Sequence, residues 1–433
     1  MRRAGPAARV TAERAGPPVA LYVHVPFCLS LCPYCDFVVV AGAAARGPRA
    51  RIDPFLAALR TEIELRADAA DRQFGPPSSP TSPGRGPLET LYLGGGTPSL
   101  LPADAIAGLT ELVRQRFGLA RDAEVTLEAN PGPDDRGDPA AQRRAGVTRL
   151  SIGAQSLAAA ELRTLGRRHR ARDVAAAVEA ARAAAIGSIS LDLLYDIPGQ
   201  TIGSWMTTLD EALALGPDHF SAYALTLDDP DAEGLTGPLG DHLPTKPGAR
   251  RWRAAARGQQ DEDRAAAMYH HAIVRLRDDG WLGYEISNWA RPGHESRHNL
   301  VYWERRPYEA VGPGAHAFDG VERRWNAARL DAYVAALAPP AGRVPRLPPG
   351  GAETIDTATA TSERLILGLR TARGIPSSAM REPPLDEVAA WAVAAELLEL
   401  VTANGERGRQ AGERLRLTTR GRLLSNELFA RLV

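Results

Sequence analysis

Short apolar runs alternate with amphipathic stretches through the first half of the chain. Each apolar run is rich in β-branched or aromatic residues and is bounded by Gly, Pro, Asn or Asp, which predicts a buried strand. The predicted strands are residues 19–25, 88–93, 123–132, 146–156, 187–201 and 218–227. Apolar residues at helical spacing predict helices between them, at residues 54–70, 102–117, 158–165, 171–184 and 202–215.

Strands that alternate with helices in this way predict an α/β fold built on a parallel sheet. About six such units precede residue 230, so a partial parallel (β/α)6 barrel fits better than a full barrel of eight units. In parallel barrels the site lies at the carboxyl ends of the strands. Five residues fall near such ends: Cys28, Gly95, Glu128, Gln155 and Asp192. We therefore expect polar groups to converge at one mouth of the barrel.

The pattern changes after residue 230. Residues 261–279 form an amphipathic helix, and the stretch 284–318 is rich in His, aromatic residues and Gly. The segment 343–353, RVPRLPPGGAE, is typical of a linker. The last block is helical and then predicts a strand, a turn, a strand and a helix, which is similar to a small winged-helix module. We expect a C-terminal α+β extension that ends in this module.

These changes predict four parts, and bulk charge says little about their partners. The parts are a disordered leader at 1–18, a barrel at 19–230, a second segment at 231–345 and the C-terminal module at 346–433. The leader is Arg-rich, as transit peptides are, but the same Ala, Arg, Gly and Pro bias runs through the chain. Lys plus Arg equals Asp plus Glu at 52 each, so charge gives no argument for nucleic acid.

The chain has three cysteines, and they lie within eight residues at Cys28, Cys32 and Cys35. This CxxxCxxC spacing cannot build a disulfide framework, whereas clustered thiolates bind iron-sulfur clusters, zinc or Cu(I). A zinc site completed by His24 or Asp36 is the main chemical alternative to a cluster. Reducible thiols and the lack of an apolar run of about 18 residues predict a cytoplasmic protein.

The cysteine loop resembles that of radical S-adenosylmethionine enzymes. It follows a Tyr-x-His-x-Pro-Phe lead-in and has Tyr34 inside its last cysteine pair. The resemblance implies that the three cysteines hold a 4Fe-4S cluster. It further implies that the amino and carboxylate groups of S-adenosylmethionine occupy the iron that no cysteine ligates.

Other residues in order along the chain match one branch of that superfamily, which contains oxygen-independent coproporphyrinogen III oxidase and the heme chaperones called HemW. Gly94 to Thr97 form a glycine turn that is neither a GxGxxG nor a Walker loop. Taken alone, Glu128 and Asp192 are equally explained as helix caps or ion-pair partners. The resemblance implies S-adenosylmethionine contacts from Tyr22, Tyr34, Gly95, Gly96, Thr97, Glu128, Gln155, Arg167 and Asp192.

Two details favour the chaperone over the oxidase within this branch. The oxidase has a further cysteine where this chain has Phe37. The sequence HNLVYW matches the heme-associated HNxxYW motif through His298, Asn299, Tyr302 and Trp303. A single histidine is also commonly a packed, hydrogen-bonded residue, so this part of the match stands beside a purely structural alternative. In one departure, Asp196 stands where the family commonly has Gly.

The resemblance therefore implies a heme chaperone that binds heme, a 4Fe-4S cluster and S-adenosylmethionine. It would pass heme to acceptor hemoproteins, with respiratory, membrane-associated ones among the candidates. The alternative is the oxidase reaction, radical decarboxylation of porphyrinogen propionates. The sequence leaves open whether the protein forms a homodimer.

Overall fold

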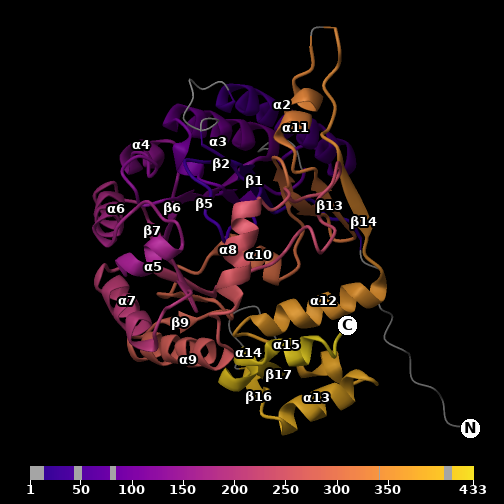
Figure 1. The fold of residues 1–433 in the computed structure, drawn as a ribbon. Coiled ribbons are helices and arrows are strands. Elements are labelled where there is room, and N and C mark those ends of the chain that lie inside the picture. The colour runs from indigo at the N-terminus through magenta and orange to yellow at the C-terminus, as the bar shows by residue number, and fades with distance from the viewer. Residues whose placement is uncertain (1–13, 43–50, 79–83, 341, 404–411) are drawn as a thin grey trace, which may run out of the picture.

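The computed structural model describes residues 14–42, 51–78, 84–340, 342–403 and 412–433 (Figure 1). Most of the predicted leader lies outside these ranges. The disorder expected for the leader therefore stays a prediction. None of the helices in the described ranges combines the length and the apolar character that crossing a bilayer requires.

Six parallel strands form the centre of the molecule, and they confirm the predicted α/β fold class. They pair in chain order, with every neighbouring pair parallel. The six are β1 (Ala20–Val25), β4 (Leu88–Gly95), β5 (Leu119–Ala129), β6 (Arg149–Gln155), β7 (Ser188–Tyr195) and β8 (His219–Ala224). In β6 all residues except Gln155 are buried, as expected for a parallel strand covered on both faces.

Helices cover the outer face of this curved sheet (Figure 1). They are α2 (Ile52–Phe74), α3 (Ala103–Phe117), α4 (Pro139–Arg144), α5 (Ala159–Thr164), α6 (Ala171–Ala183) and α7 (Ile202–Ala214). Local chemistry sets their limits: the Thr201 hydroxyl accepts a hydrogen bond from the Ser204 backbone at the start of α7, and α3 ends at Gly118 with φ 74°. Apolar side chains from both layers form one continuous core between sheet and helices.

The second segment of the chain completes both edges of the sheet. At one edge β11 (Glu309–Val311) pairs parallel to β1, and at the other β10 (Asn288–Ala290) pairs antiparallel to β8. The outermost strand is β9 (Leu282–Gly283). The helices of this segment are α8 (Pro247–Arg257), α9 (Glu262–Asp278), α10 (Arg297–Trp303) and α11 (Leu330–Leu337). Residues 231–345 therefore extend the barrel sheet at both of its ends.

The segment predicted as a linker contributes a strand instead. Residues Gly350–Thr354 form β14, which pairs with β13 (Glu322–Asn326) in a three-stranded sheet begun by β12 (His316–Phe318). The linker prediction for 343–353 was wrong over these residues because the glycines suit a close approach. A Cβ on Gly350 would lie 1.9 Å from the Trp325 carbonyl oxygen, so only Gly fits there.

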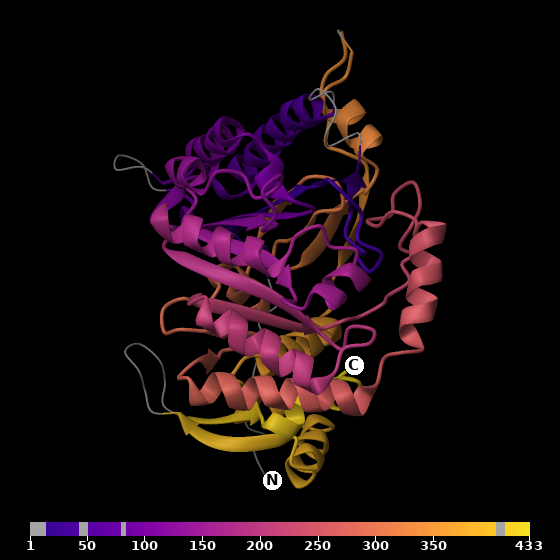
Figure 2. The same cartoon turned by 60° about the vertical axis from the view of Figure 1, so that its left-hand side comes forward.

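The C-terminal module has its own small core and packs beneath the barrel. It contains α12 (Thr357–Arg370), α13 (Leu385–Ala394), α14 (Thr419–Leu423), α15 (Ser425–Phe429) and an antiparallel sheet of β15 (Ile375–Pro376), β17 (Gly412–Leu417) and β16 (Leu398–Ala403). The predicted strand, second strand and helix are β16, β17 and α14. Figures 1 and 2 both place the module (yellow) against α9, and α14 contacts that helix.

Candidate functional site

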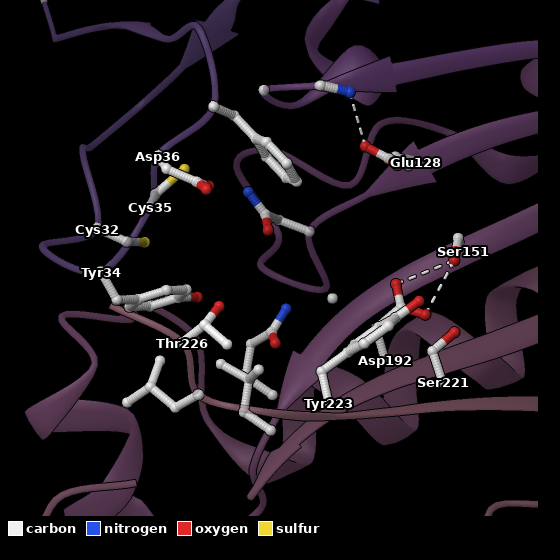
Figure 3. Close-up of a pocket in the computed structure, with 18 of the residues that line it drawn as sticks. Cys32, Tyr34, Cys35, Asp36, Glu128, Ser151, Asp192, Ser221, Tyr223 and Thr226 are labelled. Carbon is white, nitrogen blue, oxygen red and sulfur yellow. Dashed lines mark hydrogen bonds between the residues drawn. The ribbon is translucent and has the colours of Figure 1, made fainter. Parts of the chain in front are cut away.

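A cavity of about 740 Å³ opens at the carboxyl ends of the parallel strands. Figure 3 shows Cys32, Cys35 and Tyr34 on one side of it and Asp192, Ser221 and Tyr223 on the other. The predicted residues that line it are Cys28, Cys32, Tyr34, Cys35, Gly95, Gly96, Glu128, Gln155, Arg167, Asp192 and Asn299. The predicted convergence at one mouth is present, because parallel strands end at the same edge of the sheet.

The cysteine loop is held from behind by an arginine that the sequence did not single out. Its first residues form β2 (Phe27–Cys28), which pairs with β3 (Val40–Ala41). On α8, the buried Arg253 donates hydrogen bonds to the backbone oxygens of Pro33 at 3.2 Å and Cys35 at 2.9 Å. One guanidinium thus fixes the backbone between the second and third cysteines. No local spacing links residue 253 to residue 35, so only the folded chain reveals it.

Polar contacts surround two of the thiols. The Thr97 hydroxyl lies 3.2 Å from Sγ of Cys28, and it also accepts a hydrogen bond from the Asn130 amide at 2.9 Å. Arg167 approaches Sγ of Cys32 to 3.6 Å and donates to the Gly153 carbonyl at 2.8 Å. Thr97 is therefore buried under the cysteine loop and does not line the cavity. Arg167 places a positive charge beside Sγ of Cys32, which would stabilise a thiolate there.

Burial keeps the thiols of Cys28 and Cys35 protonated in the absence of a metal. It raises the pKa of Cys28 to about 11, and it raises the pKa of Cys35 as well. Ligation of a metal by these groups would release the thiol protons. The positive charge of the metal would offset the cost of burying thiolates.

The glycine turn brings backbone close to neighbouring strands. A Cβ on Gly95 would lie 2.5 Å from the His24 ring, and φ of Gly95 is 108°, so both space and backbone conformation demand glycine. The Gly95 N–H donates to one oxygen of Glu128 at 2.8 Å, and the Tyr92 hydroxyl donates to the other at 2.8 Å. Burial nevertheless raises the pKa of Glu128 to about 7. This carboxyl is the natural partner for a cationic ligand group in the cavity.

Asp192 faces Glu128 from two strands away (Figure 3). Its carboxylate accepts hydrogen bonds from Ser151 at 2.9 Å and from Ser190 at 3.2 Å, while burial raises its pKa. Between these strands the β6–β7 register shifts after Ile152, and Gln155 takes φ 64°. This irregularity ends β6 and turns Gln155 toward the cavity, a use of a bulge that is common beside active sites.

Asp196 occupies a left-handed backbone position, with φ 57°, which explains why glycine is usual there. Its side chain offsets part of that strain, because one carboxylate oxygen pairs with Arg264 of α9 at 2.5 Å. Asp196 is therefore accommodated at a position that favours glycine, and Asp192 lines the cavity.

Besides Thr97, four predicted residues lie outside the first cavity. Tyr22 and Tyr302 line a second cavity instead, and Trp303 packs under Arg370 with its ring 4.5 Å from that guanidinium. His298 is buried, with Nδ1 2.7 Å from the Thr90 hydroxyl and Nε2 2.8 Å from the Tyr302 hydroxyl. Both of its ring nitrogens are thus engaged within the protein. This geometry favours the hydrogen-bonded alternative for His298 over direct ligation of iron.

The donor set fits a cluster better than a single ion. Among the described residues, no three or more His, Cys, Asp or Glu side chains are grouped to hold one metal ion. His24 cannot complete a zinc site in this arrangement, because its ring contacts the Tyr22 hydroxyl at 3.0 Å and the Val38 carbonyl at 2.9 Å. Three soft thiols spread along one wall of a large cavity suit a cluster of several iron atoms, with room beside it for a second ligand.

Sequence reasoning missed other residues that line the cavity. Among them are Asn130, Asp135, Ser151, Tyr223, Arg370, Ser425 and Asn426. Asn130 had a usable signal, because it stands two positions after Glu128, and alternate positions along a strand share one face. Ser425 and Asn426 had none, because they come from the C-terminal module.

Comparisons with known proteins agree with this architecture. The Radical SAM superfamily matches residues 22–212, and the HemN C-terminal domain matches residues 355–424. The solved structure of coproporphyrinogen III oxidase (HemN) from Escherichia coli superposes with a TM-score of 0.73, covering 97% of this chain and 91% of that one at 22% identity. The fold and the three-thiol site define a member of the Radical SAM superfamily with a HemN-type C-terminal domain.

Curated relatives indicate which family within this superfamily the chain belongs to. The heme chaperone HemW of Mycobacterium tuberculosis is 37% identical over 98% of this chain and 96% of its own length. That of Escherichia coli is 34% identical over 69% of this chain and 70% of its own. The bovine mitochondrial radical S-adenosyl methionine domain-containing protein 1 is 38% identical over 69% of this chain and 60% of its own. The chain belongs to the HemW family, and its superfamily implies a 4Fe-4S cluster and S-adenosylmethionine.

Proposed function

We propose that this protein is a heme chaperone of the HemW type, which binds heme and transfers it to acceptor hemoproteins in the cytoplasm or at a membrane surface. The observation that carries the proposal is the 37% identity to a heme chaperone HemW along 98% of the chain. Such coverage extends across the barrel, the second segment and the C-terminal module together. The proposal therefore concerns the whole protein and not the barrel alone.

The large cavity would hold the cluster and S-adenosylmethionine. Cys28, Cys32 and Cys35 would ligate the cluster, and Arg167 would balance its negative charge. Glu128, in contact with the glycine turn, is placed to accept hydrogen bonds from the amino group of the ligand. When bound, the cluster would supply an electron to the sulfonium. The side chains of the cavity would bind the cluster and S-adenosylmethionine and orient them.

The residue Phe37 supports the function of a heme chaperone over that of a coproporphyrinogen III oxidase. It replaces the further cysteine of the oxidase, and its side chain is 60% exposed at the rim of the cavity. Single exposed aromatic residues are common on protein surfaces, so the support comes from the position of Phe37 on the lining of the cavity and not from its exposure. An apolar surface here suits a porphyrin, whereas a thiol would suit redox chemistry.

One assay separates the two functions. Protein with its cluster reconstituted anaerobically is titrated with hemin, and the same preparation is incubated with coproporphyrinogen III, S-adenosylmethionine and a reductant. We expect hemin binding at about one equivalent and unchanged coproporphyrinogen. Decarboxylated porphyrinogen in the second reaction would assign the oxidase function instead. Zinc in place of iron and sulfide in the purified protein would overturn the cluster itself.

A further inference from the structure

A second, smaller cavity of about 300 Å³ lies beside the first one. It is lined by Tyr22, His24, Phe37, Val38, Asp241, His242, Tyr302, Tyr308, Gly314 and His316. Phe37 lines both cavities, so one exposed ring borders the two. The volume is at the lower end of the range for ligand sites and cannot enclose a whole porphyrin. A flat ligand would be held here by one part and would stay accessible on the other.

Two histidines in this cavity share one carboxylate. Nε2 of His316 lies 2.7 Å from one oxygen of Asp241, and Nδ1 of His242 lies 3.0 Å from the other. Because a carboxylate only accepts, each of these nitrogens carries the proton, and the lone pairs fall on Nδ1 of His316 and Nε2 of His242. The hydrogen bonds among the described residues leave both of those nitrogens unbonded. A histidine whose second nitrogen is held by a carboxylate is the usual form of a metal-ligating histidine.

The histidines are accessible but well placed. Side-chain exposure is 37% for His316 and 28% for His242, whereas Asp241 is mostly covered at 12%. The loop that carries Asp241 is fixed by its backbone, since the Ala328 N–H donates to the Gly240 carbonyl at 2.8 Å. The imidazoles therefore have a defined position without being buried.

The aromatic wall of the cavity links it to the HNxxYW motif. His298 contacts the Tyr302 hydroxyl at 2.8 Å, and the Tyr302 ring packs edge-on against Tyr308 with centroids 4.6 Å apart. The buried His298 thus orients a tyrosine that lines the cavity. In this geometry Tyr302 of the motif forms part of the wall of the second cavity, and His298 holds it from behind that wall.

Resting on the function proposed above, we propose that the second cavity seats the heme and that the pair His242 and His316, anchored by Asp241, supplies the axial ligand to its iron. Phe37, Tyr302 and Tyr308 would contact the porphyrin. Partial enclosure suits a cargo that must leave again. The second cavity borders the first across Phe37.

The test uses the full chain with its cluster reconstituted and hemin as the probe. The variants are His242→Ala, His316→Ala, the double variant, Asp241→Asn, His298→Ala and, as a matched control, His270→Ala, an exposed histidine of α9. Absorbance titration gives the affinity, and the Soret and electron paramagnetic resonance signals of ferric heme report imidazole ligation. Cluster absorbance and urea unfolding show whether each variant is folded.

We expect the double variant to bind hemin at least tenfold more weakly and to lose the imidazole signature while its cluster absorbance is unchanged. Asp241→Asn, which keeps both imidazoles, should weaken binding a few-fold, and His270→Ala should bind as the parent does. Parent protein that binds hemin, with a double variant of equal affinity and spectrum, would overturn this site and leave the chaperone function standing. Parent protein with an intact cluster that binds no hemin would overturn the chaperone function and this site with it.

Discussion

The two cavities that meet at Phe37 are assembled in different ways. The first is built from the ends of consecutive parallel strands and from three cysteines within eight residues. The second takes its groups from β1, from the loop at residues 241–242, from α10 and from β12, and no short motif joins them. A site formed by repeated βα units can therefore be predicted from the periodicity of apolar residues in the sequence. A site formed where distant segments pack together cannot.

The substitution with the largest predicted effect should remove the ligand of the first cavity and leave hemin binding in the second cavity unchanged. Cys32→Ala removes one of three thiols, and two ligands cannot retain a cubane, so iron and sulfide content should fall to background. Hemin affinity should stay within about twofold, since no cysteine lines the second cavity. Elemental analysis and hemin titration of the same sample measure both. Unchanged iron content would contradict the cluster assignment, and loss of hemin binding would show that the cavities depend on each other.

Arg253→Met tests how firmly the first cavity depends on the second segment of the chain. Loss of the guanidinium leaves the partly buried oxygens of Pro33 and Cys35 without this donor, which costs about 2 to 4 kcal/mol of unfolding free energy. Cluster content should fall several-fold. The control is Arg250→Met on the same helix, whose ion pair with Asp231 is exposed to solvent and should contribute far less to stability. Urea unfolding that ranks the two variants equally would contradict this role.

Glu128→Gln tests the electrostatics of the first cavity through pH. The folded protein binds the Glu128 proton up to pH about 7, compared with an ordinary value of 4.5. Because the folded state holds more protons, stability is highest below pH 4.5 and is lost as pH rises through 7. The parent should lose about 3 kcal/mol relative to Glu128→Gln between pH 4.5 and 8. Urea midpoints without added S-adenosylmethionine measure this, and parallel pH profiles would contradict it.

The smallest effect on stability is expected at the residue that both cavities share. Phe37 is 60% exposed, so Phe37→Leu should change the free energy of unfolding by less than about 0.5 kcal/mol. Hemin affinity should fall two- to fivefold as aromatic contact is lost, with the cluster unaffected. A stability loss above about 1 kcal/mol would show that Phe37 is a packing residue and not a ligand-facing one.

The six strands, their order and the mouth they share followed from sequence, because apolar runs and helical spacing are local signals. Cys28, Glu128, Gln155 and Asp192 were placed correctly for the same reason. The role of Arg253 was out of reach, since it arises from a helix 218 residues away from Cys35. The sequence left open whether His298 ligates iron, because a motif carries residue types but not the hydrogen bonds of the folded state. The Gly350 strand was missed because glycine and proline are typical of both linkers and tightly packed edges.

The C-terminal module lines the large cavity with Ser425 and Asn426. The cavity can therefore be completed only after the end of the chain has been synthesised. About 390 residues separate Cys35 from Asn426, so on a ribosome the thiols emerge roughly 20 to 80 seconds before the last of the covering residues. During that interval the cysteine loop is open to the machinery that delivers iron and sulfide. Truncation before α12 should therefore give a chain that acquires its cluster readily and also loses it readily to oxygen and chelators.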